Sequence, residues 1–295
     1  MSIAHPFVYE KPATVGQALK LLSRHGPRAR VLAGGTDLIG LMVDGAERPD
    51  VVVDIKGIKG LKDIRREKSA TVLGSLATFT DVLESSLIRR KLPVMAEMAG
   101  WVASRGVRNR GTLVGNICSA VPCCDTGPIL LAYRAQILVK GPRGARRVPI
   151  DKWFTGPRTT VLKPRELVIG IRIPDPGRHA GCFVKMRRYR GEDLAQASVT
   201  VLLMPGKEWR VAFGSVAPKP IQGKRIERLL KGRSLDAGLM DKVVDLTAKE
   251  IAPITDIRST REYRAHMIRV MMRRALEGAV SRKAGKGPPY GSELI

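Results

Sequence analysis

The sequence is poor in aromatic residues, which make up only 4% of its 295 positions. Proteins that bind single-stranded nucleic acid usually line a basic groove with aromatic side chains and stack the bases on them. The scarcity of such side chains argues against this class of function, even in a chain that carries many positive charges.

Cysteine is also scarce, with four residues at positions 118, 123, 124 and 182. Three of them crowd into one short segment, which is not the pattern of a secreted disulfide framework, and a chain of this length does not need disulfide staples. The spacing Cys-x4-Cys-Cys matches neither a zinc site nor a ferredoxin cluster. We therefore expect reduced, buried thiols and no metal site.

Long hydrophobic runs are missing. The most apolar stretch, Ile129 to Val139, is interrupted by Arg134 and is much shorter than the roughly 20 residues that a membrane-spanning helix needs. No apolar segment typical of a signal peptide follows Met1. These absences predict a soluble, cytoplasmic protein without a transmembrane segment.

Acidic residues are few: 27 Asp and Glu face 52 Lys and Arg, for a formal net charge of +25. Such a field favours partners that carry phosphate or other negative groups, including nucleic acid and anionic membranes. The charge alone does not choose among them. Because the basic residues are scattered along the chain, we favour a solvated basic surface over a nucleic-acid role.

Two glycine-containing segments carry most of the chemical information. Val31 to Leu38 reads VLAGGTDL, and Arg110 to Asp125 reads RGTLVGNICSAVPCCD. Each follows an apolar stretch and forms a turn in which backbone N–H groups can approach a bound anion. An isolated Gly34-Gly35 pair would indicate only a tight turn. Two such turns can hold both phosphates of a dinucleotide, so the pair predicts a cofactor site.

Local patterns predict three folded units. In the first, Thr14 and Gln17 have the spacing of a helix capping box, and the apolar periodicity predicts a helix over 15–25. Strands over 30–33 and 49–55 and a helix over 36–43 complete this unit, which we assign to residues 1–55.

The second and third units have different patterns. Residues 56–176 are predicted to contain a strand at 70–75, helices over 80–90 and 92–103, a hairpin of 135–140 with 145–150, and a strand at 166–173. Residues 177–282 are predicted to contain strands at 181–188, 197–204 and 209–216, followed by helices. The last helix is expected to open at a capping box of Ser259 and Glu262 and to bury Tyr263, Met267, Val270, Met271 and Ala275. Residues 283–295 are expected to form a flexible tail.

The order of these motifs resembles a known family over the whole length of the chain: the FAD-binding subunits of the molybdenum hydroxylases, the group that contains aerobic carbon monoxide dehydrogenase and xanthine dehydrogenase. The segments that carry the resemblance are Leu32 to Leu38, Arg108 to Asn116, Ala120 to Pro122 with Asp125, Glu166 to Pro174, Phe183 to Lys185 with Asp193, and Glu262 to Arg264 before Arg274 to Leu276.

The resemblance implies an α+β fold, in which a two-subdomain FAD-binding module of the PCMH type precedes a C-terminal domain with a three-stranded antiparallel sheet and helices. It implies that the loops around Gly34 and Gly115 bind the FAD pyrophosphate. It places Asp125 and Ser119 near polar atoms of the cofactor, Val168 near the flavin ring, and Lys185 where its charge stabilises reduced flavin. The full set of expected cofactor-binding residues is Leu32, Ala33, Gly34, Gly35, Thr36, Asp37, Leu38, Ala103, Thr112, Val114, Gly115, Asn116, Ser119, Asp125, Val168 and Lys185.

Other roles remain open for several of these residues. Asn116 and Asp125 are also residue types that cap helices, and Lys185 on a strand can simply face solvent. Two positions depart from the family pattern. Val114 stands where the family has a glycine, and a β-branched residue adopts positive φ only at a cost. Leu194 stands where the carbon monoxide enzyme has a tyrosine beside the ring.

No catalytic residues for substrate conversion are evident, because the four histidines lie outside the motifs. The resemblance implies an oxidoreductase subunit that passes electrons from [2Fe–2S] clusters of a small partner subunit through FAD to an external acceptor such as NAD or a quinone. The substrate would be oxidised at a molybdopterin centre in a large partner subunit, in a dimer of heterotrimers. A related reductase has an iron–sulfur cluster on an inserted loop, which is missing here. The alternatives are a scaffold or nucleic-acid-associated protein that keeps the fold without flavin, and a flavin oxidase with its own substrate pocket.

Overall fold

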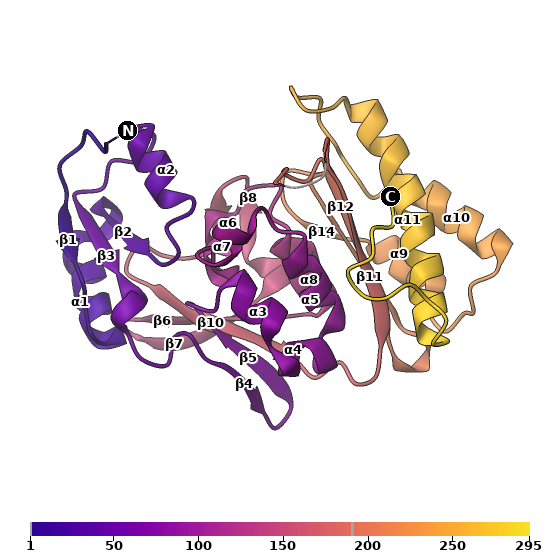
Figure 1. The fold of residues 1–295 in the computed structure, drawn as a ribbon, viewed down its shortest axis with the longest axis horizontal. Coiled ribbons are helices and arrows are strands. Elements are labelled where there is room, and N and C mark those ends of the chain that lie inside the picture. The colour runs from indigo at the N-terminus through magenta and orange to yellow at the C-terminus, as the bar shows by residue number, and fades with distance from the viewer. Residues whose placement is uncertain (1, 190–191) are drawn as a thin grey trace.

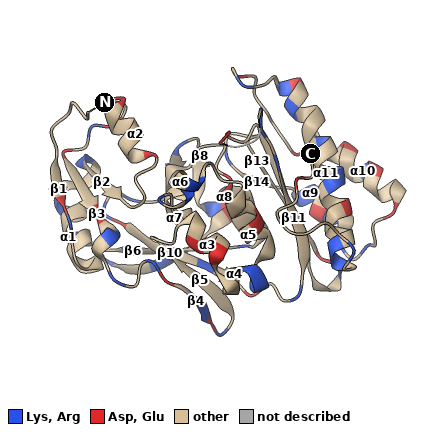
Figure 2. Cartoon of the chain, viewed as in Figure 1, with Lys and Arg blue, Asp and Glu red and all other residues tan. Residues whose placement is uncertain are grey.

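Three β-sheets, each with its own helices, follow one another along the chain (Figure 1). The computed structural model describes residues 2–189 and 192–295. Each sheet contributes to a separate cluster of buried apolar side chains. Lys and Arg residues lie on all three parts, interspersed with acidic residues (Figure 2). Within the described residues, no helix is both long and apolar enough to span a bilayer.

The first sheet is parallel, with the strand order β1-β3-β2. Its elements are β1 (Val8–Glu10), α1 (Val15–His25), β2 (Ala29–Leu32), α2 (Leu38–Val43) and β3 (Val51–Asp54). The predicted capping box is present, because Thr14 accepts from the Gln17 amide and Gln17 accepts from the Thr14 amide. The parallel arrangement brings the carboxyl end of β2, and the glycine turn after it, to one edge of the sheet.

The second sheet has five antiparallel strands in the order β4-β5-β10-β6-β7. Its strands are β4 (Ile64–Glu67), β5 (Ala70–Gly74), β6 (Gln136–Gly141), β7 (Gly144–Pro149) and β10 (Leu167–Pro174). The predicted hairpin is β6 with β7, whose ends Gly141 and Gly144 pair directly. The helices are α3 (Phe79–Glu84), α4 (Ser86–Lys91), α5 (Pro93–Gly100), α6 (Arg105–Arg108), α7 (Leu113–Ser119) and α8 (Thr126–Ala132), with a small ribbon of β8 (Phe154–Gly156) and β9 (Thr159–Thr160). The two helices expected over 80–103 are therefore three shorter ones, separated at Ser85 and Leu92.

The third sheet is antiparallel and buried on both faces. It contains β11 (Ala180–Met186), β12 (Ala197–Leu203) and β13 (Trp209–Gly214), and a two-residue strand β14 (Ile221–Gln222) adds to the three that were predicted. One face packs against α9 (Lys224–Leu230) and α11 (Arg261–Lys283), and α10 (Ala237–Thr247) packs on these two helices; the other face lies against α5 and α8 of the second unit. Burial on both sides explains why every residue of β11 and β12 is buried.

Two details of α11 differ from the prediction. The N-cap residue is Thr260, whose side chain accepts from the Tyr263 amide, and Ser259 lies one residue before it. The buried face includes Met271 and Ala275 as expected, but Tyr263 is exposed. The remaining buried positions are Arg264, Ile268, Met272, Leu276, Gly278 and Ala279. The apolar stripe is displaced because the first turn contributes a buried arginine instead of the tyrosine.

A half-buried histidine, His179, lies in the link between the second and third units. His179 Nδ1 donates to the Gly177 carbonyl, and His179 Nε2 accepts from the Tyr133 hydroxyl at 2.9 Å. Since a carbonyl can only accept, Nδ1 carries a proton, and in the neutral ring Nε2 accepts from the Tyr133 hydroxyl. Burial lowers the pKa of His179 below its ordinary value of 6.5.

Stability should therefore fall in mild acid. Below pH 6.5 the unfolded chain takes up a proton at His179 before the folded chain does, so stability decreases from there down to the folded pKa. A His179→Asn variant should lose less stability over this range than the native protein. Urea unfolding at a series of pH values measures this, with exposed His266→Asn as the control. Parallel pH profiles for His179→Asn and the native protein would contradict it.

Candidate functional site

The first glycine turn follows β2 and offers a row of free backbone donors. Gly35 has φ +81, a conformation that suits glycine. Within the described residues, the amides of positions 34 to 38 donate no hydrogen bond to protein. Asp37 stands at the N-cap position of α2, but its side chain makes no capping bond. A bound anion with several oxygen atoms would satisfy such amides.

The second glycine turn lies directly against the first. A Cβ atom placed on Gly34 would lie 2.1 Å from the Arg110 carbonyl oxygen, so the two backbones approach too closely for any side chain. Thr112 caps α7 by accepting from the Gly115 amide at 2.9 Å. Of the predicted donors in this turn, the amides of Thr112 and Val114 have no protein acceptor among the described residues.

A side-chain hydrogen bond joins the two turns. Ser119 Oγ, at the end of α7, donates to Asp37 Oδ2 at 2.5 Å. The turn before α2 accordingly lies beside α6 and α7 (Figure 1). The free amides of two segments about eighty residues apart in sequence therefore lie close together in space. This donor set fits a diphosphate, which offers charged oxygen atoms to both turns.

Val114 does not disturb the second turn. It lies in the first turn of α7 with ordinary helical backbone, and its side chain is 4% exposed in the central apolar core. The residues with positive φ do not include it. The valine therefore points away from the free amides, and the difference from the family pattern affects packing in the core.

Replacing Val114 with glycine, the residue of the family pattern, should leave FAD affinity within about threefold of the native value. The same change should lower the free energy of unfolding by roughly 2–4 kcal/mol, because it removes a buried side chain and adds a glycine to a helix. Fluorescence titration with FAD and urea unfolding measure the two effects. A variant that binds FAD much more tightly would indicate that the valine obstructs the turn.

Asn116 and Asp125 both lie at the N-terminal end of α8. Asn116 lies within α7, and its Oδ1 accepts from the Thr126 hydroxyl and, at 3.4 Å, from the Thr126 amide. Asn116 therefore acts as a helix-capping residue, which was the alternative to cofactor binding, and the helix that it caps is α8. Asp125 stands at the N-cap position of α8 and makes no side-chain capping bond.

Asp125 pairs instead with Lys185, as a buried ion pair. Lys185 Nζ lies 2.7 Å from Asp125 Oδ2 and also donates to the Trp101 carbonyl at 3.1 Å. Burial raises the pKa of Asp125, and the charges of Lys185 and Arg187 oppose this rise. Asp125 Oδ1 is buried and has no hydrogen-bond partner among the described residues. Lys185 is thus not a solvent-facing strand residue, and the pair keeps one acceptor for a polar group of a ligand.

Ala103 and Val168 occupy different environments. Ala103 has φ +40, and its carbonyl accepts from Arg108 at 2.6 Å. It lines a pocket of about 490 Å³ together with Trp101 and Arg187. Val168 lies in β10 with its side chain inside the central core. Ala103 and Lys185 therefore both lie close to Trp101. Val168 is buried among apolar side chains.

Sequence reasoning missed the contacts around Trp101. The Arg187 guanidinium lies 4.5 Å from the centre of the Trp101 ring and binds Glu293 at 3.1 Å. The signal was weak, because a lone tryptophan after a helix and an arginine just after a strand have no characteristic spacing. Their proximity depends on the packing of α5 against β11.

The cysteines are thiols without disulfide bonds. Cys124 and Cys182 are buried, and burial raises the pKa of each thiol to about 12. Metal ligation needs the thiolate, which this environment disfavours. Within the described residues, no group of three His, Cys, Asp or Glu side chains is arranged to hold a metal ion.

Comparisons with known proteins agree with the resemblance. Residues 5–176 match the family model "FAD binding domain in molybdopterin dehydrogenase", and residues 182–279 match "CO dehydrogenase flavoprotein C-terminal domain". The chain is 31% identical to the carbon monoxide dehydrogenase medium chain of Hydrogenophaga pseudoflava over 94% of this chain and 98% of that one. It is 30% identical to the xanthine dehydrogenase FAD-binding subunit of Escherichia coli O157:H7, covering 94% and 97% of the two chains. A solved structure, reconstituted CO dehydrogenase from Oligotropha carboxidovorans, superimposes with a TM-score of 0.92 at 34% identity, covering 95% of this chain and 100% of that one.

Proposed function

The chain belongs to the family of FAD-binding subunits of the molybdenum hydroxylases, and from this we propose that it is the electron-transfer subunit of such an enzyme. In this proposal it receives electrons from a [2Fe–2S] subunit and delivers them to an external acceptor. The substrate is oxidised in a molybdopterin subunit, and the three chains assemble as a dimer of heterotrimers.

The observation that carries the proposal is the pair of glycine turns with free amides, tied together by Ser119 and Asp37. We assign the FAD pyrophosphate to the amides of positions 34 to 38, Thr112 and Val114. When bound, FAD supplies the chemistry that links one-electron and two-electron carriers, and the protein supplies binding, orientation and electrostatics.

The buried pair of Asp125 and Lys185 supports the same assignment. Lys185 is fixed at two points, by the Asp125 carboxylate and the Trp101 carbonyl, so its charge has a defined position. A fixed positive charge beside a flavin favours the reduced, anionic form. The free Oδ1 of Asp125 can accept from a hydroxyl of the cofactor.

Purification with the partner subunits tests the proposal. The chain should be produced together with molybdopterin and iron–sulfur subunits from the same organism and isolated as a yellow complex with a flavin spectrum. FAD titration of the isolated chain should be compared with a nucleic-acid titration at several salt concentrations, since phosphate-driven binding weakens steeply with salt. A colourless chain that does not bind FAD but binds nucleic acid would favour the scaffold alternative. Substrate turnover by the isolated chain would favour a flavin oxidase.

A further inference from the structure

Arg264, the last residue of the motif Glu262 to Arg264, is a buried arginine in the first turn of α11. Its side chain is 3% exposed, and arginine is seldom buried to this extent unless its charge is paired. Its guanidinium donates to Asp256 Oδ1 at 2.6 Å and to the Ser215 carbonyl at 3.2 Å. Ser215 directly follows β13, so Arg264 ties the start of α11 to the end of that strand.

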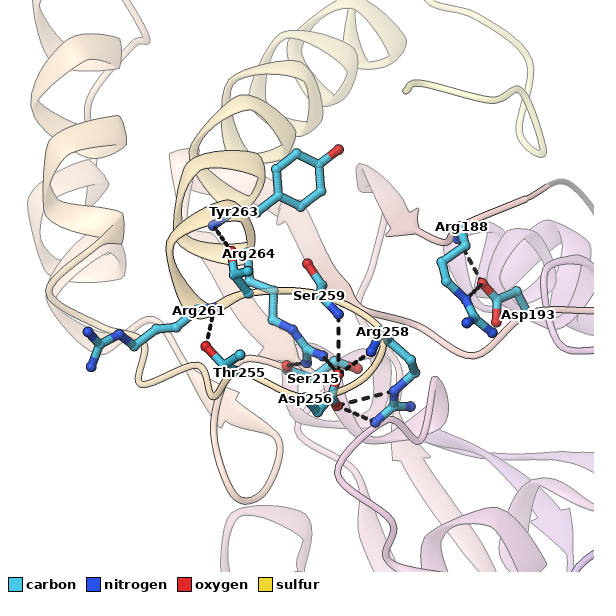
Figure 3. Close-up of polar contacts among 11 residues, drawn as sticks. Arg188, Asp193, Ser215, Thr255, Asp256, Arg258, Ser259, Arg261, Tyr263 and Arg264 are labelled. Carbon is cyan, nitrogen blue, oxygen red and sulfur yellow. Dashed lines mark hydrogen bonds and ion pairs between the residues drawn. The ribbon is translucent and has the colours of Figure 1, made fainter.

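Asp256 fixes the direction of the Arg264 side chain (Figure 3). Its carboxylate also accepts from the amides of Arg258 and Ser259, at 2.9 and 3.3 Å, and from the Arg258 guanidinium at 2.7 Å. The backbones of Asp256 and Ser259 exchange hydrogen bonds of 3.1 and 3.2 Å. The turn in front of α11 is therefore closed, and it gives Arg264 a fixed partner.

Ser215, the other partner of Arg264, has a backbone conformation that is rare for serine. Its φ is +63, in the left-handed region, which is sterically unfavourable for a residue with a side chain. In this conformation its amide donates to the Pro122 carbonyl of the second unit at 3.1 Å. Rotation about φ moves the carbonyl relative to the amide, so a return to negative φ would break one of the two hydrogen bonds. Arg264, bonded to the carbonyl, opposes that return.

Pro122 and Asp125 belong to one short turn between α7 and α8. The Cys124 amide closes this turn by donating to the Val121 carbonyl at 2.9 Å. Asp125 follows at once, pairs with Lys185 and presents its buried Oδ1. Because the turn leads directly into α8, a shift of Pro122 moves the Asp125 carboxylate as well.

Arg258 makes a second contact with the same turn. Its guanidinium, held by Asp256, interacts with the side chain of Cys123. The cluster around Asp256 thus reaches the turn by two routes, one through Arg264 and Ser215 and one through Arg258. Both routes lead from the third unit to the second.

Stability alone does not explain an arginine at position 264. A buried ion pair often stabilises a fold no more than apolar side chains of similar volume would. A guanidinium can do what an apolar side chain cannot, because its fixed array of donors sets the positions of two acceptors relative to each other. Here the two acceptors are the Asp256 carboxylate and the Ser215 carbonyl.

We propose that Arg264 is a positioning residue for the cofactor site. It holds Ser215 in the left-handed conformation, and Ser215, together with Arg258, holds the turn that presents Asp125. This inference rests on the proposed function, in which Asp125 Oδ1 accepts from a hydroxyl of FAD. A motif in the third unit then acts on a carboxylate of the second.

FAD titration of variants of the full chain tests the inference. Arg264→Lys keeps the charge, but one ammonium group does not reproduce the paired donors that hold Asp256 and the Ser215 carbonyl. We expect about tenfold weaker FAD binding, because a displaced Asp125 loses a hydrogen bond made by a charged group. Arg261→Lys is the matched control. The Arg261 side chain is 67% exposed and points away from Asp256 (Figure 3), so its replacement should leave FAD affinity unchanged.

A glycine at position 215 should restore binding. Glycine adopts positive φ without steric cost, and Ser215 Oγ has no hydrogen-bond partner among the described residues, so the change removes no such contact. The double variant Ser215→Gly with Arg264→Lys should bind FAD within about threefold of the native affinity. Lys207→Gly is the control for this rescue, since Lys207 also has positive φ, at +56, in the β12–β13 connection. Combined with Arg264→Lys, it should restore nothing.

The reduction potential of the flavin in the assembled complex gives a second measurement. Lys185 is bonded to Asp125, so a displaced carboxylate also displaces the positive charge that favours reduced flavin. Reduction in the Arg264→Lys complex should be about threefold to tenfold less favourable, which corresponds to a potential roughly 15–30 mV lower for a two-electron couple. A general loss of stability would leave the potential of the bound flavin unchanged.

The outcomes separate the inference from the proposed function. If the native chain binds FAD and Arg264→Lys binds it equally well, the inference is overturned while the proposed function stands. If the native chain does not bind FAD, both fail. A loss of affinity that Ser215→Gly does not restore, or that Lys207→Gly restores equally well, also overturns the inference. Should Arg264→Lys not fold, Arg258→Met replaces it: about threefold weaker FAD binding supports the inference, and native affinity overturns it.

Discussion

A Gly34→Ala variant is expected to bind FAD at least about a hundredfold more weakly than the native chain. The added methyl group would lie 2.1 Å from the Arg110 carbonyl oxygen and 2.8 Å from its carbon, both backbone atoms that cannot rotate away. The two turns must therefore move apart. Losing two charge-assisted hydrogen bonds costs roughly 3–6 kcal/mol, which corresponds to this loss of affinity or more. Fluorescence titration with FAD measures it.

Gly40→Ala is the matched control for this variant. Gly40 lies in α2, a few residues from the first turn, and a Cβ atom there meets nothing within 4 Å. Alanine at this helical position should leave FAD affinity unchanged and stabilise the fold by about 0.5–1 kcal/mol. Native affinity in Gly34→Ala would mean that the contact between the two turns is not needed for the cofactor site.

Replacing Glu97 with alanine should lower the free energy of unfolding by about 3–5 kcal/mol, the usual cost of breaking a buried ion pair. Glu97 on α5 is fully buried and binds both terminal nitrogens of Arg282, at 2.7 and 3.1 Å. It also accepts from the amides of Phe183 and Gly291. The variant leaves these donors and a buried positive charge without their acceptor. Urea unfolding of the purified chain measures the change.

The exposed pair of Arg261 and Glu262 provides the comparison. Its members lie 3.1 Å apart, and both side chains are more than half exposed. Removing Glu262 should leave the free energy of unfolding nearly unchanged, since water already solvates both charges. Equal effects of the Glu97→Ala and Glu262→Ala substitutions would show that burial does not strengthen the Glu97 contacts.

Local signals in the sequence predicted the elements that depend on neighbouring residues. Thr14 and Gln17 fixed the start of α1, and the Gly141 to Gly144 turn defined the β6–β7 hairpin. At the start of α11 two hydroxyl residues are adjacent: the sequence pattern predicted Ser259 as the N-cap, and the N-cap in the structure is Thr260. Either hydroxyl can cap, and the choice depends on the closing of the Asp256 turn in front of α11.

The sequence also predicted both glycine turns, because a turn that has no room for a side chain requires glycine, and glycine is recognisable in the sequence. It did not predict what holds them together or what surrounds them. Asp125 and Lys185 are 60 residues apart, and Glu97 and Arg282 are 185 apart. No spacing rule connects such pairs, since their partners are selected by the packing of α5 and α8 against the third sheet.

The contacts of residues 284–295 have a consequence for the way the protein is made. This segment, expected to be a loose tail, lies against the body of the chain: Arg282 donates to the carbonyls of Pro288 and Pro289 and stacks on Tyr290, and the Gly291 amide reaches Glu97. Domains fold in order as they leave the ribosome. Nearly two hundred residues after Glu97 must be translated before Arg282 is available to pair with its carboxylate. A nascent chain that stalls before residue 282 therefore carries a carboxylate without its counter-charge at the junction of its units.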